Sequence, residues 1–123
     1  MIGVLVVDDH AQFRRVARDV VEATPGFEPL GEATSGEEAL EMAARLHPEL
    51  VLLDVRLPGM DGVETARSIT AAHPEMTVFL ISLDDLKALP AGHASCGAAT
   101  FVRKTDLRCA ELQRLWAAHG PVG

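Results

Sequence analysis

The sequence has few cysteines and no apolar run long enough for a membrane span. Although 48% of its 123 residues are hydrophobic, no continuous stretch approaches the roughly 18 residues that a span needs. Met1 leads directly into an apolar segment with no basic region before it, so no signal peptide is indicated. Cys96 and Cys109 are too few for a disulfide framework or a zinc site, and we interpret them as free thiols. We therefore expect a cytoplasmic protein without membrane contact.

Aromatic residues and positive charges are also scarce. Aromatics make up 4% of the chain, which leaves the core to Leu, Val, Ile and Ala. With 11 Lys and Arg against 18 Asp and Glu, the formal net charge is -7. This charge argues against direct contact with nucleic acid. The length fits one domain with its own core.

Apolar strand-like runs alternate with amphipathic helical patterns along the whole chain. We expect strands over 4–7, 27–33, 50–54, 77–81 and 100–102, and helices over 12–24, 35–46, 62–73 and 106–119. This alternation predicts an α/β domain with a parallel sheet. Pro29 cannot donate a ladder hydrogen bond, which suits an edge strand. Pro90 and Gly92 interrupt the segment 84–97, so a helix there is expected to be short or irregular.

Two local patterns support the helix assignments. In the first helix, apolar side chains recur at the spacing of one helical face, namely Phe13, Val16, Ala17, Val20 and Val21. Ser35 followed by Glu38 has the spacing of a capping box, which predicts the start of the second helix.

Polar side chains suited to chemistry stand where the expected strands end. Asp8 and Asp9 follow the first strand, Asp54 ends the third, Ser82 follows the fourth, and Lys104 follows the fifth. Right-handed crossovers make all strands of such a sheet point the same way, so these ends share one rim. Ligands of open α/β sheets bind outside that rim. We therefore expect three carboxylates, a hydroxyl and an ammonium group to meet in a small volume.

This set of side chains suggests phosphoryl chemistry at a metal ion. Three neighbouring carboxylates repel and raise one another's pKa values, and a hard divalent ion such as Mg2+ relieves the repulsion. Asp54 is then suited to attack a phosphoryl group and form an aspartyl phosphate. Lys104 and Ser82 are suited to stabilise charge on the phosphoryl oxygens.

In order and spacing, these motifs resemble receiver domains of two-component response regulators. The matching features are the pair Asp8 and Asp9, Asp54, Pro58 with Met60-Asp61-Gly62, Ser82, and Phe101 three residues before Lys104. The resemblance extends from Val4 to about His119. The sequence Asp-Asp-His after the first strand resembles the corresponding sequence in the subfamily whose receivers precede a LuxR-like helix-turn-helix.

The resemblance implies a fold and a function. The fold is flavodoxin-like (βα)5, with a five-stranded parallel sheet of order 2-1-3-4-5 and helices on both faces. The function is a phospho-accepting switch in a phosphorelay, in which Asp54 takes a phosphoryl group from a histidine kinase or a histidine phosphotransfer protein. The catalytic residues are then Asp54, Lys104 and Ser82, and the switch residues are Ser82 and Phe101. Phosphorylation would change the face formed by 84–97, 100–102 and 106–119.

The resemblance also implies a cofactor and limits the activity. Mg2+ would be held by Asp8, Asp9, Asp54 and the backbone carbonyl of Arg56. The protein would not be an enzyme beyond its own phosphotransfer and slow dephosphorylation, and a homodimer formed on phosphorylation is a further expectation. We expect a receiver domain over 1–119, a tail over 120–123 and no output domain in this sequence.

Three features depart from the usual pattern of the family, and one of them is the interruption of the fourth helix by Pro90 and Gly92. The residue after Ser82 is commonly small, and here Leu83 stands there, which predicts slower access to the acceptor. Proline joined by a cis bond commonly follows the lysine, and here Thr105 follows Lys104, so that bond is either trans or strained. We assign His10 no role, and we interpret Met60 as packing.

The sequence argues against two alternative functions and leaves two others open. A phosphatase acting through an aspartyl phosphate usually has a second acid two residues after the nucleophile, where this chain has Arg56. A flavin-binding protein would need more aromatics and a hydroxyl-rich loop after the first strand. A pseudo-receiver acting by protein contact alone is a third possibility, and the excised receiver of a DNA-binding transcriptional regulator is a fourth.

Overall fold

The regular elements alternate along the chain as strand and helix. The computed structural model describes residues 1–83 and 89–121. Its strands are β1 (Ile2–Val7), β2 (Phe27–Ala33), β3 (Leu50–Asp54), β4 (Thr77–Ser82) and β5 (Thr100–Arg103). Its α-helices are α1 (Ala11–Ala23), α2 (Gly36–Leu46), α3 (Gly62–Ala72) and α4 (Cys109–His119). Short 3-10 turns occupy His93–Ser95 and Lys104–Asp106.

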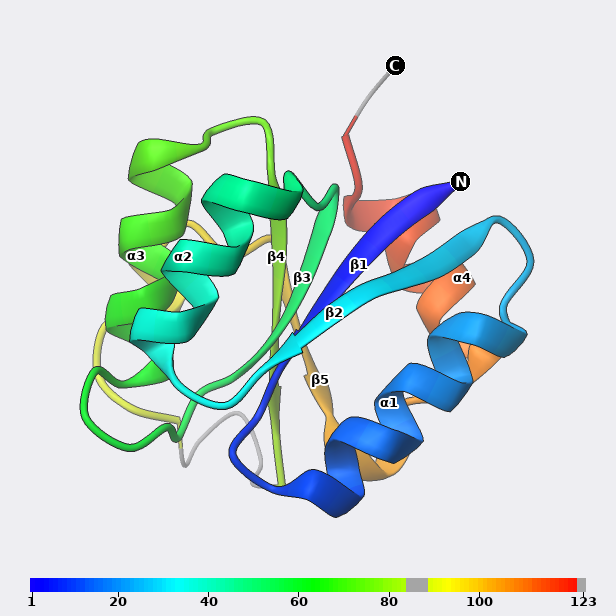
Figure 1. The fold of residues 1–123 in the computed structure, drawn as a ribbon, viewed down its shortest axis with the longest axis horizontal. Coiled ribbons are helices and arrows are strands. Elements are labelled where there is room, and N and C mark those ends of the chain that lie inside the picture. The colour runs from blue at the N-terminus through cyan, green and yellow to red at the C-terminus, as the bar shows by residue number, and fades with distance from the viewer. Residues whose placement is uncertain (84–88, 122–123) are drawn as a thin grey trace.

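The strands form one parallel sheet in the order β2-β1-β3-β4-β5, which confirms the predicted order (Figure 1). β2 lies at an edge, as Pro29 predicted. The pairing of β2 with β1 shifts at this proline, because Val4 pairs with Pro29 whereas Leu5 pairs with Gly31. The strand ends relevant to the site, those of β1, β3, β4 and β5, point to the same rim.

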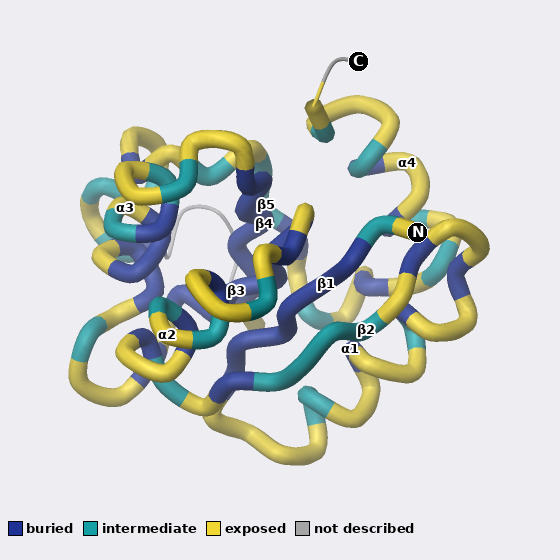
Figure 2. The backbone as a smooth tube through the Cα atoms, turned by 45° about the horizontal axis from the view of Figure 1, so that its top comes forward, coloured by how far each residue is buried: buried dark blue, intermediate teal, exposed yellow. Residues whose placement is uncertain are grey.

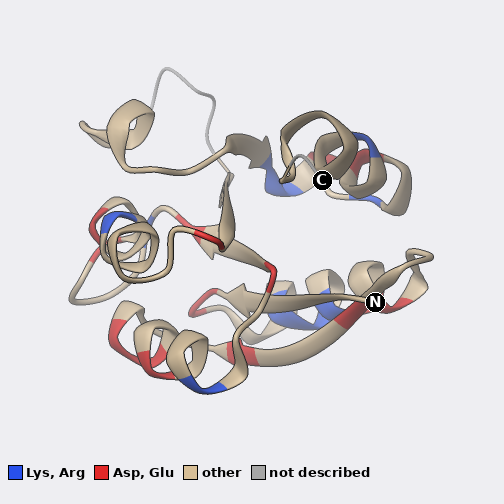
Figure 3. Ribbon diagram, turned by 90° about the horizontal axis from the view of Figure 1, so that it is seen from above, with Lys and Arg blue, Asp and Glu red and all other residues tan. Residues whose placement is uncertain are grey.

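The helices cover both faces of the sheet. α1 and α4 pack on one face, and α2 and α3 pack on the other (Figure 1). β3 and β4 are buried along their whole length and β1 from its second residue on, so the tube of these strands is dark in Figure 2. The helices α1 and α2 differ in charge, because α1 carries three arginines and two acids whereas α2 carries three glutamates and one arginine (Figure 3).

Helix starts follow the predicted capping chemistry. The Ser35 hydroxyl accepts a hydrogen bond from the Glu38 backbone N–H at 3.1 Å and caps α2. The Glu38 side chain accepts in return from the N–H of Thr34, one residue before the position that the capping box predicts. Asp61 caps α3 by accepting from the N–H of Glu64 at 2.8 Å.

The region after β5 differs from the prediction. The last helix begins at Cys109 and not at Asp106, because Lys104–Asp106 forms a 3-10 turn and Leu107 is then extended. The side chain of Leu107 is buried in the core layer of α1 and α4, which breaks the helical path. The described residues contain no cis peptide bond, so the bond between Lys104 and Thr105 is trans.

Two further expectations have mixed outcomes. The predicted irregular helix over 84–97 lies partly outside the described residues, and its described part contains only the turn His93–Ser95. In the apolar stripe of α1, Ala17 and Val21 are buried, but Val16 is 50% exposed. Within the described ranges, no helix is long and apolar enough to cross a membrane.

Candidate functional site

The polar residues predicted at the strand ends meet at one rim of the sheet. Asp8, Asp54 and Ser82 are all buried there, with exposed fractions of 0%, 4% and 1%. They come from the ends of β1, β3 and β4, and Lys104 reaches Asp8 and Asp54 from the end of β5. Asp54, Ser82 and Lys104 line an open pocket of ≈ 230 Å³, together with His10, Arg56 and Leu83.

Asp54 is held at both oxygens. Its Oδ1 accepts a hydrogen bond from the backbone N–H of Arg56 at 3.0 Å, and its Oδ2 accepts one from Lys104 Nζ at 3.1 Å. The loop after β3 turns back against Asp54 because residue 62 is glycine. A Cβ on Gly62 would lie 2.1 Å from the Asp54 carbonyl oxygen, closer than any real contact. The glycine of the Met-Asp-Gly motif is therefore needed for the loop to pack against the backbone of Asp54.

Asp8 is the most deeply buried acid of the group. Its Oδ1 accepts a hydrogen bond from the backbone N–H of His10 at 2.8 Å. Its Oδ2 forms an ion pair with Lys104 Nζ at 2.5 Å and otherwise has no hydrogen-bond partner within the described part of the chain. A buried carboxylate oxygen with so few partners is suited to a further cation.

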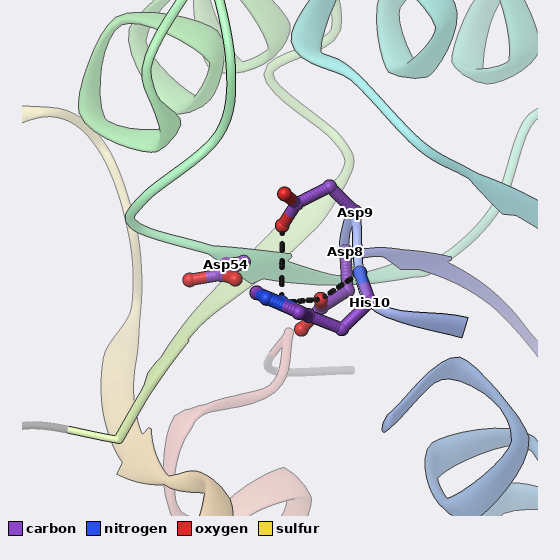
Figure 4. A group of neighbouring side chains, drawn as sticks. All are labelled: Asp8, Asp9, His10 and Asp54. Atoms are coloured by element: carbon purple, nitrogen blue, oxygen red, sulfur yellow. Dashed lines mark hydrogen bonds and ion pairs between the residues drawn. The ribbon is translucent and has the colours of Figure 1, made fainter. Parts of the chain in front are cut away.

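Asp9 and His10 complete the acidic group (Figure 4). Ligand atoms of Asp8, Asp9, His10 and Asp54 all lie within 4.8 Å of one another. The His10 ring contacts two of the acids, since its Nδ1 lies 3.2 Å from Oδ1 of Asp8 and 3.2 Å from Oδ1 of Asp9. Sequence reasoning gave His10 no role, and nothing in its local pattern indicated that the ring turns back onto both acids.

Lys104 is the central cation of this rim. Its ammonium contacts Asp8 and Asp54 and lies 4.7 Å from the centre of the Phe13 ring on α1. A cation over an aromatic face is attracted to it. Because only 7% of the lysine side chain is exposed, these three contacts fix where the positive charge lies.

Burial and neighbouring charges shift the pKa values of the two central groups. Burial raises the pKa of Asp54 above its ordinary value, and the charge of Asp8 adds to the rise, against the Arg56 N–H and Lys104. Burial alone would lower the pKa of Lys104, but the close approach of Asp8 and Asp54 raises it above its ordinary value. The lysine is therefore protonated at neutral pH.

Ser82 and Phe101 lie on the same face of the sheet. Phe101 in β5 pairs with Leu80, which is two residues before Ser82 in β4. The Phe101 ring is half-buried against the core layer of α2 and α3. It also lines a hollow of ≈ 400 Å³ beside the turn at His93. The fold thus leaves space next to this ring.

Leu83 lies at the opening of the site. Its side chain is 67% exposed, and it lines the pocket that contains Asp54. It also lines a neighbouring, mostly apolar groove of ≈ 500 Å³, to which Phe13 and Val16 of α1 contribute. Leu83 therefore stands beside the entrance and does not fill the pocket.

Comparison with known proteins gives consistent matches over nearly the whole chain. Residues 4–114 match the family model of the response regulator receiver domain. Response regulator GacA of Pseudomonas viridiflava is 36% identical over 104 residues, which are 85% of this chain and 49% of that protein. The transcriptional regulatory protein LiaR of Bacillus subtilis (strain 168) is 36% identical over 114 residues, which are 91% of this chain and 53% of that protein. The chain spans about half the length of the curated relatives it matches.

A solved structure gives the same result. The signal receiver domain of the response regulator NarL from Mycobacterium tuberculosis superposes with a TM-score of 0.86 and 31% sequence identity. The match covers 96% of this chain and 95% of that chain.

Proposed function

Because this chain belongs to the response regulator receiver domain family of two-component signalling, we propose that it is a phospho-accepting switch whose acceptor is Asp54. The observation that carries this proposal is the position of the Asp54 carboxylate. It lies at the floor of an open pocket, held by the Arg56 N–H and by Lys104, with Asp8 beside it. A carboxylate placed in this way is a suitable nucleophile for phosphorus.

We propose Mg2+ as the cofactor. The donor set fits it, because hard carboxylate oxygens of Asp8, Asp9 and Asp54 lie close together. Among the described residues, Oδ2 of Asp8 has no partner besides the Lys104 ammonium. Asp8, Asp9, Asp54 and the backbone carbonyl of Arg56 would hold the ion. When bound, Mg2+ neutralises carboxylate and phosphoryl charge at the acceptor.

The transfer step uses the residues around Asp54. A carboxylate oxygen of Asp54 attacks the phosphorus of a phosphohistidine, a P–O bond forms, and the P–N bond breaks with its electron pair going to the imidazole nitrogen. The Lys104 ammonium, already 3.1 Å from Oδ2, then pairs with a phosphoryl oxygen. Position 56 holds an arginine, so this position provides no acid to protonate a leaving group. This supports a switch over an enzyme with turnover.

The switch follows from the charge that arrives on Asp54. A phosphoryl group adds about -1.5 to -2 charge and three acceptor oxygens. The Ser82 hydroxyl donates to one of these oxygens and moves inward, and the Phe101 ring turns into the space that Ser82 leaves. The face formed by the described part of 84–97, β5 and α4 has two conformations, and phosphorylation shifts the population from one to the other.

The partners follow from the family and the charge. We propose a histidine kinase or a histidine phosphotransfer protein as the phosphodonor, a homodimer formed on phosphorylation, and no direct contact of this domain with nucleic acid or a membrane. We also propose a cytoplasmic location and a receiver domain over 1–119 with a tail over 120–123.

A second candidate function is the receiver part of a DNA-binding transcriptional regulator. It is favoured by the lengths of the relatives, because the chain spans only about half of GacA and LiaR. The name of LiaR describes a transcriptional regulator. Both candidates share the same phosphorylation step at Asp54.

The test is the mass of the intact protein after incubation with a small-molecule phosphodonor and Mg2+. One added phosphoryl group is expected in the wild type. It is absent in Asp54→Asn and in wild type with the metal chelated. If the protein binds Mg2+ but gains no phosphoryl group, the proposal fails and a pseudo-receiver acting by protein contact replaces it.

A further inference from the structure

A second layer of charged residues holds the backbone of the loop that carries Asp8 and Asp9. The Arg14 guanidinium on α1 donates from Nη1 to the backbone carbonyl oxygen of Asp8 at 2.9 Å. Its Nε forms an ion pair with Oε1 of Glu32 on β2 at 3.3 Å. Only 18% of the arginine side chain is exposed, so it lies between the helix and the edge strand and does not extend into solvent.

Glu32 is in turn held by a second arginine. Its Oε2 lies 3.4 Å from Nη1 of Arg18, one helical turn after Arg14. The residue after Glu32 also contributes, since the carbonyl oxygen of Ala33 accepts a hydrogen bond from the N–H of Asp8 at 3.0 Å. The backbone of Asp8 is thus held at its N–H by β2 and at its carbonyl by Arg14.

The orientation of the Asp8 carbonyl determines how the chain enters Asp9. That carbonyl and the N–H of Asp9 belong to one planar peptide group, so fixing the oxygen fixes the plane. The Asp9 side chain is 36% exposed, and its carboxylate pairs with the ring of His10. This peptide plane, together with the contact to His10, therefore contributes to the direction of the Asp9 carboxylate.

We propose that Arg14, held by Glu32, is a positioning residue that turns the Asp8–Asp9 peptide so that the Asp9 carboxylate faces the Mg2+ site. This inference rests on the proposed function, because it assumes that Mg2+ binds there. The positioning role and the charge of Arg14 predict opposite changes in Mg2+ affinity when Arg14 is replaced. A positive charge near a cation site weakens binding, so loss of the Arg14 charge alone would tighten Mg2+ binding. Loss of a positioning residue weakens it.

The experiment is calorimetric titration of the full chain with Mg2+, comparing wild type, Arg14→Gln and Arg15→Gln. Arg15 carries the same charge on the same helix but is exposed, so its variant is the matched control. We expect the Kd for Mg2+ to rise about 10-fold in Arg14→Gln, the lower end of the effect of losing an outer-shell partner of a metal site. Arg15→Gln is expected to bind as the wild type does or slightly more tightly.

Two further variants separate positioning from folding. Arg14→Lys keeps the charge and one donor, so it is expected to restore part of the affinity. Glu32→Gln leaves Arg14 in place but loosens it, so the Kd is expected to rise less than in Arg14→Gln; it serves as the test if Arg14→Gln does not fold. The thermal midpoint without metal is measured for each variant, and a Kd that rises without a change in the midpoint supports positioning.

The outcomes are distinct. An unchanged or lower Kd in folded Arg14→Gln, or equal changes in Arg14→Gln and Arg15→Gln, overturns the positioning role while the proposed function stands. A wild type that does not bind Mg2+ overturns the proposed metal site itself, and the positioning role with it.

Discussion

Lys104 Nζ lies 3.1 Å from Oδ2 of Asp54, although the two residues are 50 positions apart in the chain. The same ammonium lies 2.5 Å from Oδ2 of Asp8. One buried cation therefore balances two buried acids from different strands. This relationship explains how the two buried carboxylates are tolerated side by side, and it makes the stability of the protein sensitive to each of the three residues.

Replacement of the lysine tests this balance. Lys104→Gln leaves Asp8 and Asp54 without their cation, and removal of one partner of a buried ion pair typically costs about 3 kcal/mol of unfolding free energy. We expect the variant to be destabilised by about that amount in chemical denaturation without metal. We expect added Mg2+ to restore more stability to it than to the wild type, since the ion replaces the missing charge. Equal stabilisation of both proteins by Mg2+ would contradict this account.

Replacement of the acceptor acid tests the pKa shift of Asp54. Because its pKa is raised in the folded protein, the folded state binds more protons than the unfolded one, and wild-type stability falls as pH rises from the ordinary value near 3.8 through the raised value. Asp54→Asn lacks this loss, and unlike Lys104→Gln it leaves no buried charge unpaired, because Lys104 keeps its ion pair with Asp8. We expect the variant to be the more stable protein at neutral pH without metal, with the difference shrinking as pH is lowered toward 4.

Chemical denaturation in a chelating buffer between pH 4 and 8 measures this effect. Asp19→Asn on the exposed side of α1 is the control, since its carboxylate is 65% exposed. If the difference in unfolding free energy between Asp54→Asn and wild type does not vary with pH, burial of the Asp54 charge is not the cause of that difference.

Leu83 is expected to limit access to the acceptor. It lines the pocket of Asp54, and its replacement by Ala widens the entrance. We expect Leu83→Ala to accept phosphoryl groups severalfold faster from a small donor and to lose them faster to water. Val16→Ala is the control, because Val16 lines the neighbouring groove and is not among the residues that line the Asp54 pocket. Equal rates in Leu83→Ala and wild type would mean that Leu83 does not restrict the site.

The polar rim could be predicted from the sequence because each part has a local signal. Asp54 and Ser82 end apolar runs that adjacent turn residues delimit, and parallel strands bring such ends together. The exposure of Val16 could not be predicted, because a helical apolar stripe does not reveal which of its members lies beyond the core. Val16 instead lines the groove beside Leu83.

Other contacts had no signal in the sequence. Arg14 has the pattern of a solvated helix residue and Glu32 that of an edge-strand residue, and only the packing of α1 against β2 brings them together. The start of α4 was predicted too early because Asp106 suits a helix start, whereas burial of Leu107 decides the path of the chain. In both cases tertiary packing outweighs local preference.

The proposed switch predicts coupled motion of Ser82 and Phe101. The chain has 4 phenylalanines, so fluorine NMR of protein labelled at Phe gives few signals, and Phe101→Leu identifies the one of interest. We expect the Phe101 signal to shift on phosphorylation in wild type but not in Ser82→Ala. Phe27 and Phe79, which pack on Trp116 away from the site, are internal controls. A Phe101 signal that moves equally in Ser82→Ala would contradict the coupling.

The central claim is that Asp54 itself carries the phosphoryl group, and chemical mapping tests it most directly. Borohydride reduces an aspartyl phosphate to homoserine, which peptide mass spectrometry then locates in the chain. After incubation with a phosphodonor and Mg2+, the account predicts homoserine at position 54 and unmodified Asp8 and Asp9. Homoserine at either of those two acids, or a phosphoryl group on Ser82 with Asp54 intact, would contradict it.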